Sequence, residues 1–298
     1  MERGVKTVVQ FGNIITAMVT PFDRKGNLDL AKTTELVNYL LDNGTDALVV
    51  AGTTGESPTL TTEEKIALFR HVVSVVNGRA PVIAGTGTND TRASIELTKK
   101  AEEAGVDAVM LVAPYYNKPN QEGLYQHFKA IAESTSLPVM LYNVPGRTSV
   151  SLAPETVIRL SEVPNIVAVK EAGGNLDAMA EIIERTPDDF LLYSGDDSLT
   201  LPVLAIGGNG VVSVASHIIG NEMQEMIRSF LAGDHQKAAA LHRKWLPLMK
   251  GLFAAPSPVP VKTALQLRGL DVGSVRLPLV PLAEQERKEL SRLLDALS

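Results

Sequence analysis

The chain has 298 residues, of which 45% are hydrophobic and 21% charged, with a formal net charge of -6 and no cysteine. This composition is that of a globular protein with a large core, and the missing cysteines exclude disulfides, thiolate nucleophiles and cysteine-ligated metals. The acidic balance offers no basic field for nucleic acid or anionic lipid, so we expect small-molecule partners, no nucleic acid and no membrane. The segment from Met1 to Gln10 has no continuous apolar run, so we expect no signal peptide and a cytoplasmic location.

Short runs rich in Val, Ile, Ala and Leu alternate with longer segments of helical periodicity, which is the pattern of parallel βαβ units. Eight runs are predicted to be strands, beginning near Ile14, Ala47, Pro81, Ala108, Val139, Ile166, Phe190 and Gly210. Their spacing leaves room for one right-handed crossover helix after each strand. Eight similar units predict an α/β fold, a (β/α)8 TIM barrel, over residues 12–232.

The segment after the second predicted strand carries helix signals of its own. Thr61 and Glu64 fit a capping box, and Gly78 supplies a stop. Residues at helical spacing are predicted to form one apolar stripe against the sheet: Ile66, Phe69, Val73 and Val76.

The eighth barrel helix is predicted to close near Ala232, and no strand-like run follows it. Helical segments around 241–253, 261–267 and 284–297 remain, separated by proline-containing turns. We therefore expect residues 233–298 to form a C-terminal helical domain that extends the barrel.

One charged side chain, Lys170, lies within the sixth apolar run. Barrel strands are covered by helices outside and by layered side chains inside, so a charge there needs a reason. Period-two alternation places Lys170 on the face of Ile166 and Ala168, and we expect this face to point into the lumen. Withdrawal from water favours the free amine, which is the nucleophile of Schiff-base chemistry. An ion pair with Glu171 is the alternative that the strand alone leaves open.

Polar residues also follow other predicted strands at the carboxyl edge, where barrel enzymes place their sites. Thr53 and Thr54, after the second strand, carry hydroxyls that can bind a carboxylate, although the segment taken by itself is more typical of a simple turn. The fifth strand ends at Tyr142, a possible proton shuttle or core aromatic, and Arg147 beyond it could clamp a carboxylate or form a surface ion pair. Tyr116 lies in the loop after the fourth strand, where its ring could staple the loop or contact another subunit.

No metal or cofactor site is predicted. The five histidines lack the spacing of metal ligands. Asp196 and Asp197 follow the seventh strand, where carboxylates usually cap a helix rather than hold an ion. The glycine-rich segments 85–89 and 207–210 match neither a P-loop nor a dinucleotide fingerprint.

Six motifs at predicted strand ends, in this order, together resemble one family: the dihydrodipicolinate synthase (4-hydroxy-tetrahydrodipicolinate synthase) family of class I pyruvate-dependent aldolases and lyases. They are GTTGE at 52–56, PYYNKP at 114–119, YNVPGRT at 142–148, VAVKEA at 167–172, SGDD at 194–197 and GGNGVVSV at 207–214. The resemblance extends from about Gly12 to the C-terminal helices. It implies a metal-independent lyase that condenses pyruvate with L-aspartate 4-semialdehyde in diaminopimelate and lysine biosynthesis.

The resemblance also assigns roles by motif matching. Lys170 would form the imine with pyruvate. Hydroxyls of Thr53, Tyr142 and Tyr116 would relay protons, and the tyrosine that matches Tyr116 reaches in from a neighbouring subunit. The expected substrate-binding residues are Thr54 with Thr53 at the pyruvate carboxylate, Arg147 at the semialdehyde carboxylate, and the backbones of Gly195 and Val212 near the imine.

Other pyruvate-dependent aldolases share the lysine, so N-acetylneuraminate lyase and 2-keto-3-deoxy-gluconate lyase are the alternatives. In sialic acid lyases the threonine pair commonly reads Ser-Thr and an arginine matching Arg147 is absent. Thr53 and Arg147 therefore favour a short second substrate that carries its own carboxylate. A phosphate-binding barrel and a barrel without catalysis are further alternatives.

Two further expectations follow from the resemblance. The family assembles as a homotetramer, a dimer of dimers. Lysine-inhibited relatives line a crevice beside the threonine loop with histidines and a glutamate, whereas Pro58, Thr62, Lys65 and Ala93 occupy the matching positions here, beside Ser57 and Asn89. The lost acid removes the partner of an inhibitor's ammonium, so we expect weak or absent feedback by lysine.

Overall fold

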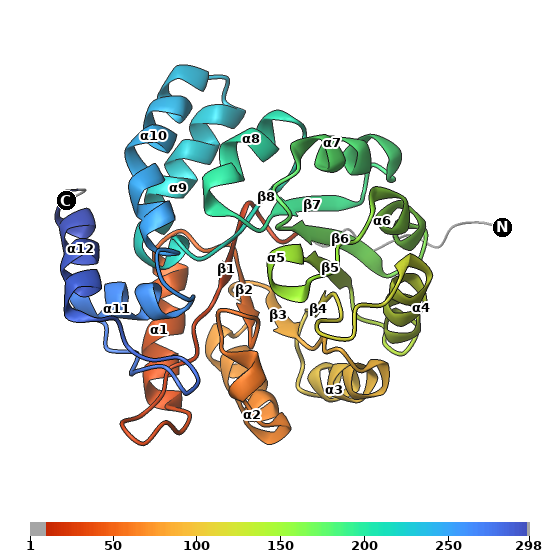
Figure 1. The fold of residues 1–298 in the computed structure, drawn as a ribbon, viewed down its shortest axis with the longest axis horizontal. Coiled ribbons are helices and arrows are strands. Elements are labelled where there is room, and N and C mark those ends of the chain that lie inside the picture. Colours follow the sequence, from red (N-terminus) through yellow and green to blue (C-terminus); the bar gives the residue numbers. More distant parts are fainter. Residues whose placement is uncertain (1–9, 297–298) are drawn as a thin grey trace.

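The computed structural model describes residues 10–296, and its eight strands close into a parallel barrel in sequence order (Figure 1). The strands are β1 (Ile14–Ala17), β2 (Ala47–Val50), β3 (Val82–Gly85), β4 (Ala108–Val112), β5 (Val139–Asn143), β6 (Ile166–Glu171), β7 (Leu191–Ser194) and β8 (Gly210–Ser213). Each predicted strand start lies within one residue of the observed start, and the (β/α)8 barrel with C-terminal helices is confirmed.

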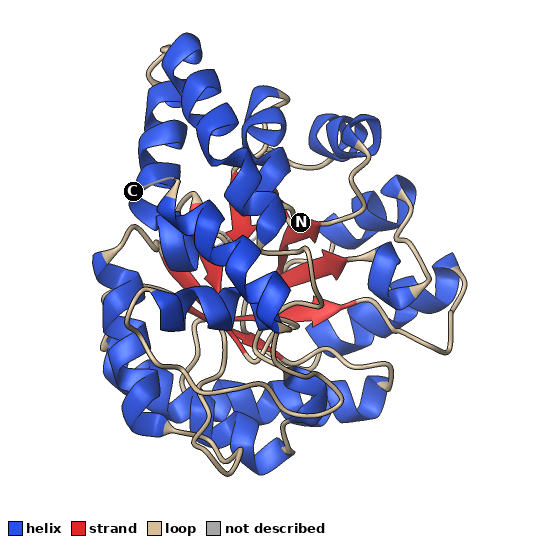
Figure 2. Cartoon of the chain, turned by 60° about the vertical axis from the view of Figure 1, so that its left-hand side comes forward, coloured by secondary structure: helices blue, strands red, loops and turns tan. Residues whose placement is uncertain are grey.

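Helices surround the strands, which occupy the middle of the molecule (Figure 2). The barrel helices are α1 (Leu30–Asp42), α2 (Thr62–Val76), α3 (Thr91–Glu103), α4 (Gln121–Ala132), α5 (Pro145–Thr148), α6 (Pro154–Ser161), α7 (Leu176–Arg185), α8 (Thr200–Ala205) and α9 (Ser216–Leu231). Ala232 is the C-cap of α9, which confirms the predicted end of the eighth barrel helix.

Helix α2 shows which sequence signals were reliable. Its capping box is present: the Glu64 N–H donates to the Thr61 hydroxyl at 3.2 Å, and the Thr61 N–H donates to the Glu64 carboxylate at 2.9 Å. The predicted stripe is partly wrong, because the buried residues are Leu68, Phe69, Val72 and Val76. Ile66 and Val73 are half-buried instead. Val73 approaches Gly105, at the turn before β4, so this side of α2 faces a neighbouring unit and not the strands.

Two hydrophobic clusters divide the core. The larger one lies between strands and helices, and the smaller one contains inward-facing side chains such as Ile15, Val49, Met140, Ala168 and Val212. Ile166 belongs to the outer cluster, so the prediction that it shares a face with Ala168 is wrong. The register between β5 and β6 shifts after Ile166, and such an irregularity inverts the alternation of side chains across it.

Three helices extend the barrel at its C-terminal end: α10 (His235–Gly251), α11 (Val259–Leu267) and α12 (Glu284–Asp295). Helix α10 begins earlier than predicted, where Asp234 accepts the Lys237 N–H at 3.0 Å as an N-cap. Its first turns are mostly exposed, so hydrophobic periodicity could not locate them. Trp245 and Leu265 join the outer cluster, so these helices share the core of the barrel. None of the helices between residues 10 and 296 combines the length and the hydrophobicity of a bilayer span.

Candidate active site

Lys170 is a buried amine inside the barrel. It lies on β6, and its side chain follows Ala168 on the inward face. Strand register places Tyr142 of β5 and Tyr193 of β7 beside it. Only 5% of Lys170 is exposed, and its Nζ lies 4.2 Å from the centroid of the Tyr142 ring. The phenol face therefore offers the buried amine a favourable electrostatic contact.

Glu171, the alternative partner of Lys170, is engaged elsewhere. Its carboxylate accepts a hydrogen bond from Asn143 Nδ2 at 2.8 Å and another from the Gly173 N–H at 2.6 Å. Burial raises the pKa of Glu171, and these two hydrogen bonds oppose the shift. No ion pair of Lys170 occurs among residues 10–296. The interpretation of Lys170 as half of an ion pair with Glu171 is therefore not supported, and its amine is available for a ligand.

A cavity of about 580 Å³ opens over Lys170. It brings together side chains that are far apart in the sequence, including Thr53, Thr54, Tyr142, Arg147, Lys170 and Gly195. A second cavity of about 280 Å³ adjoins it, because Thr53, Tyr142 and Arg147 line both. Six of the eight predicted site residues thus meet at the carboxyl ends of the strands, where barrel enzymes place their chemistry.

Glycine at position 195 keeps the space beside the amine open. A Cβ built there would lie 2.6 Å from the Ala172 Cβ and 3.2 Å from the Lys170 Cε. Any side chain would therefore collide with the strand and with the lysine stem. The absence of a side chain leaves room for a ligand to approach the Lys170 amine.

The loop that carries Thr53 and Thr54 is a tight turn between two residues in the left-handed region. Ala51 has φ 52° and Glu56 has φ 56°. The Gly55 N–H donates to the Gly52 carbonyl at 3.1 Å, and Thr20 Oγ1 donates to the Gly55 carbonyl at 2.6 Å. Backbone conformations of this kind persist only where the surroundings hold them in place. The turn therefore presents the two threonine hydroxyls in a fixed arrangement.

Arg147 lies on the short helix α5, directly after β5. Pro145 occupies the first turn of this helix, and Thr148 Oγ1 donates to the Val150 carbonyl at 2.7 Å, which secures the following turn. The Arg147 side chain is exposed and borders both cavities. A guanidinium in this position can receive a carboxylate from solvent through two parallel hydrogen bonds.

Tyr116 and Val212 are not brought to the cavities of their own chain. Tyr116 is 89% exposed and has φ 76°. Its loop is held in shape by Asn89 and Asn117: Asn117 Nδ2 donates to the Asn89 carbonyl at 2.8 Å, and Asn89 Nδ2 donates to the Tyr115 carbonyl at 3.1 Å. Val212 is 1% exposed, belongs to the interior cluster and lines neither cavity.

Sequence reasoning missed part of the cavity wall. The C-terminal region supplies Met249, Lys250, Phe253 and Ser257 to it, and Asp196 and Ser198 complete the rim. No motif marks the residues of α10, because a helix that contributes to a site through one turn keeps an ordinary periodic pattern.

The two aspartates of the SGDD motif accept hydrogen bonds from backbone N–H groups of the protein. Asp196 accepts the Ser198 N–H at 2.8 Å, which confirms the expected capping role. Asp197 accepts Ser213 Oγ at 2.5 Å and the Ala215 N–H at 2.9 Å, which ties the end of β7 to the end of β8. Burial raises the pKa of Asp197, while its hydrogen bonds oppose the shift. Within residues 10–296, no group of three or more His, Cys, Asp or Glu side chains could hold a metal ion.

Comparisons with known proteins agree along nearly the whole chain. The 4-hydroxy-tetrahydrodipicolinate synthase of Bacillus velezensis is 70% identical over 286 residues, which cover 96% of this chain and 99% of the relative. The crystal structure of dihydrodipicolinate synthase from Bacillus anthracis is 69% identical with a TM-score of 0.95, covering 96% of this chain and 98% of that one. A lysine-bound enzyme from Cyanidioschyzon merolae is 49% identical, with the same TM-score and the same coverage of both chains. Residues 10–297 match the dihydrodipicolinate synthetase family, and the chain belongs to that family.

Proposed function

We propose that this protein is a lyase that condenses pyruvate with L-aspartate 4-semialdehyde to 4-hydroxy-tetrahydrodipicolinate, in lysine and diaminopimelate biosynthesis. The observation that carries this proposal is the buried Lys170 amine, which lies against Tyr142 in a cavity lined by Thr53, Thr54 and Arg147. Two relatives that are 70% and 69% identical to this chain carry the name of this activity. Both substrates are small molecules, and a cavity of about 580 Å³ can contain them.

The chemistry begins at Lys170. Its amine attacks the pyruvate ketone and water leaves, so a protonated imine forms. The imine withdraws electrons from the methyl group of pyruvate, which loses a proton and becomes an enamine. The enamine carbon then attacks the aldehyde of the second substrate. The amino group of that substrate finally displaces the lysine at the imine carbon, which closes the ring and restores the enzyme.

The remaining residues bind charge and move protons. The hydroxyls of Thr53 and Thr54 bind the pyruvate carboxylate, and the Arg147 guanidinium binds the carboxylate of the semialdehyde. Tyr142 gives and takes the protons of imine formation and condensation, because its ring lies against the reacting amine. The backbone of Gly195, which borders the cavity, contributes polar groups near the imine.

The second substrate is inferred from Arg147. A guanidinium at the rim of the cavity suits a short aldehyde that carries its own carboxylate. N-acetylneuraminate and 2-keto-3-deoxy-gluconate would place a polyhydroxylated chain there, for which a planar cation is a poorer match. Aspartate semialdehyde is therefore preferred to the substrates of the related lyases.

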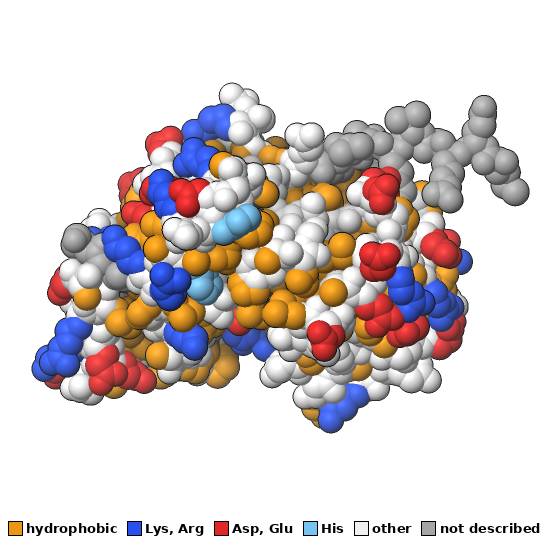
Figure 3. Space-filling view, turned by 90° about the horizontal axis from the view of Figure 1, so that it is seen from above, with side chains coloured by type: hydrophobic (Ala, Val, Ile, Leu, Met, Phe, Trp, Pro, Cys, Tyr) orange, Lys and Arg blue, Asp and Glu red, His pale blue; other side chains and the backbone are white. Residues whose placement is uncertain are grey.

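The working form is proposed to be a homotetramer in the cytoplasm, built as a dimer of dimers, in which Tyr116 of one subunit completes the proton relay of another. The exposure of the Tyr116 ring supports a contact beyond its own chain. Hydrophobic side chains also gather on the face where α7, α8 and α10 lie, with charged side chains around them (Figure 3). Exposed apolar surface of this kind is typical of protein interfaces.

Borohydride trapping tests the proposed chemistry directly. Incubation with pyruvate and borohydride should reduce the imine to a stable secondary amine, which peptide mass spectrometry should locate on the peptide that contains Lys170. The same preparation should consume aspartate semialdehyde in a coupled assay. An adduct on another lysine would refute the role of Lys170, and inactivity with aspartate semialdehyde would refute the proposed substrate.

A further inference from the structure

A buried ion pair lies at the end of the loop that carries Thr53 and Thr54. Glu56 is 3% exposed, and both of its carboxylate oxygens accept hydrogen bonds from the C-terminal region. Lys262 Nζ, on α11, donates to Oε1 at 2.7 Å, and the Arg276 N–H donates to Oε2 at 2.9 Å. More than two hundred residues of sequence separate the loop from these partners. The C-terminal region thus holds the end of an active-site loop.

Lys262 is buried, and its other contacts hold its side chain beside Glu56. It is 2% exposed, its Nζ also donates to the Ser274 carbonyl at 2.8 Å, and it lies 4.2 Å from the centroid of the Phe22 ring. Burying two charges loses hydration free energy, and the attraction between the charges often does not compensate for that loss. A buried ion pair is therefore weak evidence of a contribution to stability. Buried pairs with complete hydrogen bonding instead fix one arrangement of the chain.

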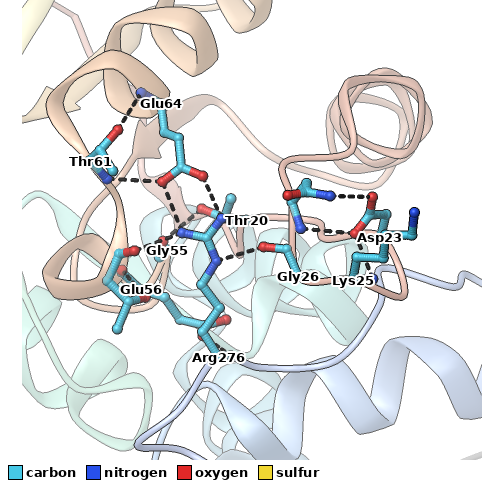
Figure 4. Close-up of polar contacts among 11 residues, drawn as sticks. Thr20, Asp23, Lys25, Gly26, Gly55, Glu56, Thr61, Glu64 and Arg276 are labelled. Carbon is cyan, nitrogen blue, oxygen red and sulfur yellow. Dashed lines mark hydrogen bonds and ion pairs between the residues drawn. The ribbon is translucent and has the colours of Figure 1, made fainter.

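Arg276 holds the segment that follows the loop. Its guanidinium donates to both carboxylate oxygens of Glu64, at 2.9 and 2.5 Å, and to the Thr59 carbonyl at 2.6 Å (Figure 4). A further bond at 2.8 Å reaches the Gly26 carbonyl. Glu64 also completes the capping box of α2 with Thr61, so the start of this helix is fixed to the same arginine. The chain from Glu56 to Glu64 is therefore held by the C-terminal region at both ends.

The contacts of Glu56 also restrain the threonine pair, because one hydrogen-bonded turn of backbone connects Glu56 to Thr53. The Glu56 N–H donates to the Thr53 carbonyl at 3.1 Å. Thr20 Oγ1 donates to the carbonyl of Gly55, the residue before Glu56 (Figure 4). Glu56 itself is in the left-handed region, with φ 56°. A residue with a Cβ leaves that region readily once its side chain is released, and the turn that contains Thr53 would move with it.

We propose that Glu56, Lys262 and Arg276 are positioning residues, through which the C-terminal helices hold the hydroxyls of Thr53 and Thr54 where the pyruvate carboxylate binds. None of the three lines the cavity over Lys170, so they act through the loop. The inference rests on the proposed role of the threonine pair. The C-terminal region would then support catalysis in two ways, by holding the threonine loop in place and by contributing residues to the cavity wall.

Lys262→Met is the principal test, because it removes the ammonium and keeps an unbranched apolar stem. The KM for pyruvate should rise about tenfold, as expected when a binding group loses its position, while the KM for the semialdehyde stays within about twofold. Lys32→Met is the matched control: it removes an ion pair of 2.7 Å between α1 and Asp271 of the same C-terminal region but leaves the loop untouched. Its pyruvate KM should equal that of the wild type.

A second change separates positioning from general damage. Lys262→Met leaves the Glu56 carboxylate buried and unpaired, so Glu56→Gln added to it should recover part of the lost pyruvate affinity. If Lys262→Met does not fold, Glu64→Gln replaces it as the test of the positioning role. Glutamine preserves the capping box and weakens only the contact with Arg276. It should raise the pyruvate KM by about threefold, and less than Lys262→Met.

The outcomes distinguish the two proposals. A wild type without condensation activity would refute the proposed function. An active wild type whose pyruvate KM is unchanged in Lys262→Met, or in Glu64→Gln where that variant replaces it, would refute the positioning role alone. An equal rise in Lys32→Met would do the same, since the effect would then be one of the whole C-terminal region. A lower melting temperature with unchanged KM values would mark the pair as structural only.

Discussion

Arg147 stands where the two cavities meet, at the rim and not at the buried end that contains the Lys170 amine. Its exposure means that a ligand carboxylate can reach the guanidinium before the rest of the site is filled. The two substrates can therefore be bound by different groups, pyruvate by the threonine hydroxyls at depth and the semialdehyde by the arginine at the entrance. This separation makes the role of the arginine testable by kinetics with each substrate.

Arg147→Ala should raise the KM for the semialdehyde by roughly tenfold to a hundredfold and change the KM for pyruvate little, because a charge-assisted hydrogen bond contributes about 1.5–3 kcal/mol. Initial rates with each substrate varied in turn measure both constants. Arg159→Ala is a suitable control, since it removes an arginine that is paired with Glu122 at 3.0 Å on the surface. Equal effects on both substrates would contradict the assignment.

His217 is a buried residue whose hydrogen bonds require the neutral ring. Nε2 accepts the Val19 N–H at 3.1 Å, so Nδ1 carries the proton and donates to the Val214 carbonyl at 2.8 Å. A second proton on Nε2 would face the Val19 N–H. Burial lowers the pKa of His217 to about 4 from the ordinary value of 6.5. The neutral ring therefore stabilises the fold at neutral pH.

The sign of the pH effect follows from this shift. The unfolded chain binds the proton as the pH falls below about 6.5, whereas the folded chain does so only near 4, so the free energy of unfolding falls across that window. The loss from His217 is on the order of 3 kcal/mol at the lower end. His217→Gln keeps an acceptor and a donor without a titrating group. Thermal unfolding at pH 7 and pH 5 should show a smaller drop for this variant than for the wild type, and equal drops would contradict the assignment.

At the scale of single elements, the crevice beside the threonine loop determines which ligands can regulate the enzyme. The smaller cavity is lined by Ser57, Pro58, Lys65, Thr88 and other residues, and its lining contains no carboxylate. Lys65 and Arg147 instead make it cationic. Burial lowers the pKa of Lys65. An ammonium ligand would find no partner there and would meet like charge.

L-lysine at millimolar concentration should therefore leave the initial rate nearly unchanged. Initial rates at fixed, subsaturating substrates with increasing L-lysine hydrochloride measure this, and an equal concentration of sodium chloride controls for ionic strength. Potent inhibition would contradict the prediction. A partial effect that disappears in Lys65→Ala would locate the ligand in the crevice but overturn the argument from charge.

Elements also show how far the sequence could predict this structure. Strand positions and the Thr61 capping box were predictable because they depend on local residues. The outward placement of Ile166 was not, because the shift of register is set by the neighbouring strand. The ion pair of Glu56 with Lys262 was equally hidden, since no local pattern links residues so far apart. Motifs at strand ends supply most of the residues that line the cavity over Lys170, whereas the wall from α10 required the tertiary structure.

For the molecule as a whole, one chain does not bring every residue of the proposed site together. Lys170, Tyr142 and Thr53 lie together within one chain, but the Tyr116 ring is 89% exposed and lines neither cavity. Its backbone is held in a left-handed conformation, as is that of Lys118, and the asparagine contacts of the loop fix that shape. A strained, ordered loop that presents an aromatic ring to solvent is suited to a neighbouring subunit.

Complementation between two inactive variants tests this arrangement. Lys170→Ala should abolish turnover, and Tyr116→Phe should reduce it about a hundredfold if the hydroxyl belongs to the proton relay. When the two are refolded together, a mixed dimer contains one subunit with an intact lysine that receives its tyrosine from the other chain. About a quarter of the sites should then be complete, because half of the dimers are mixed and each has one such site. Activity should return to about that fraction of the wild type, whereas a mixture no more active than its separate components would show that Tyr116 does not act across subunits.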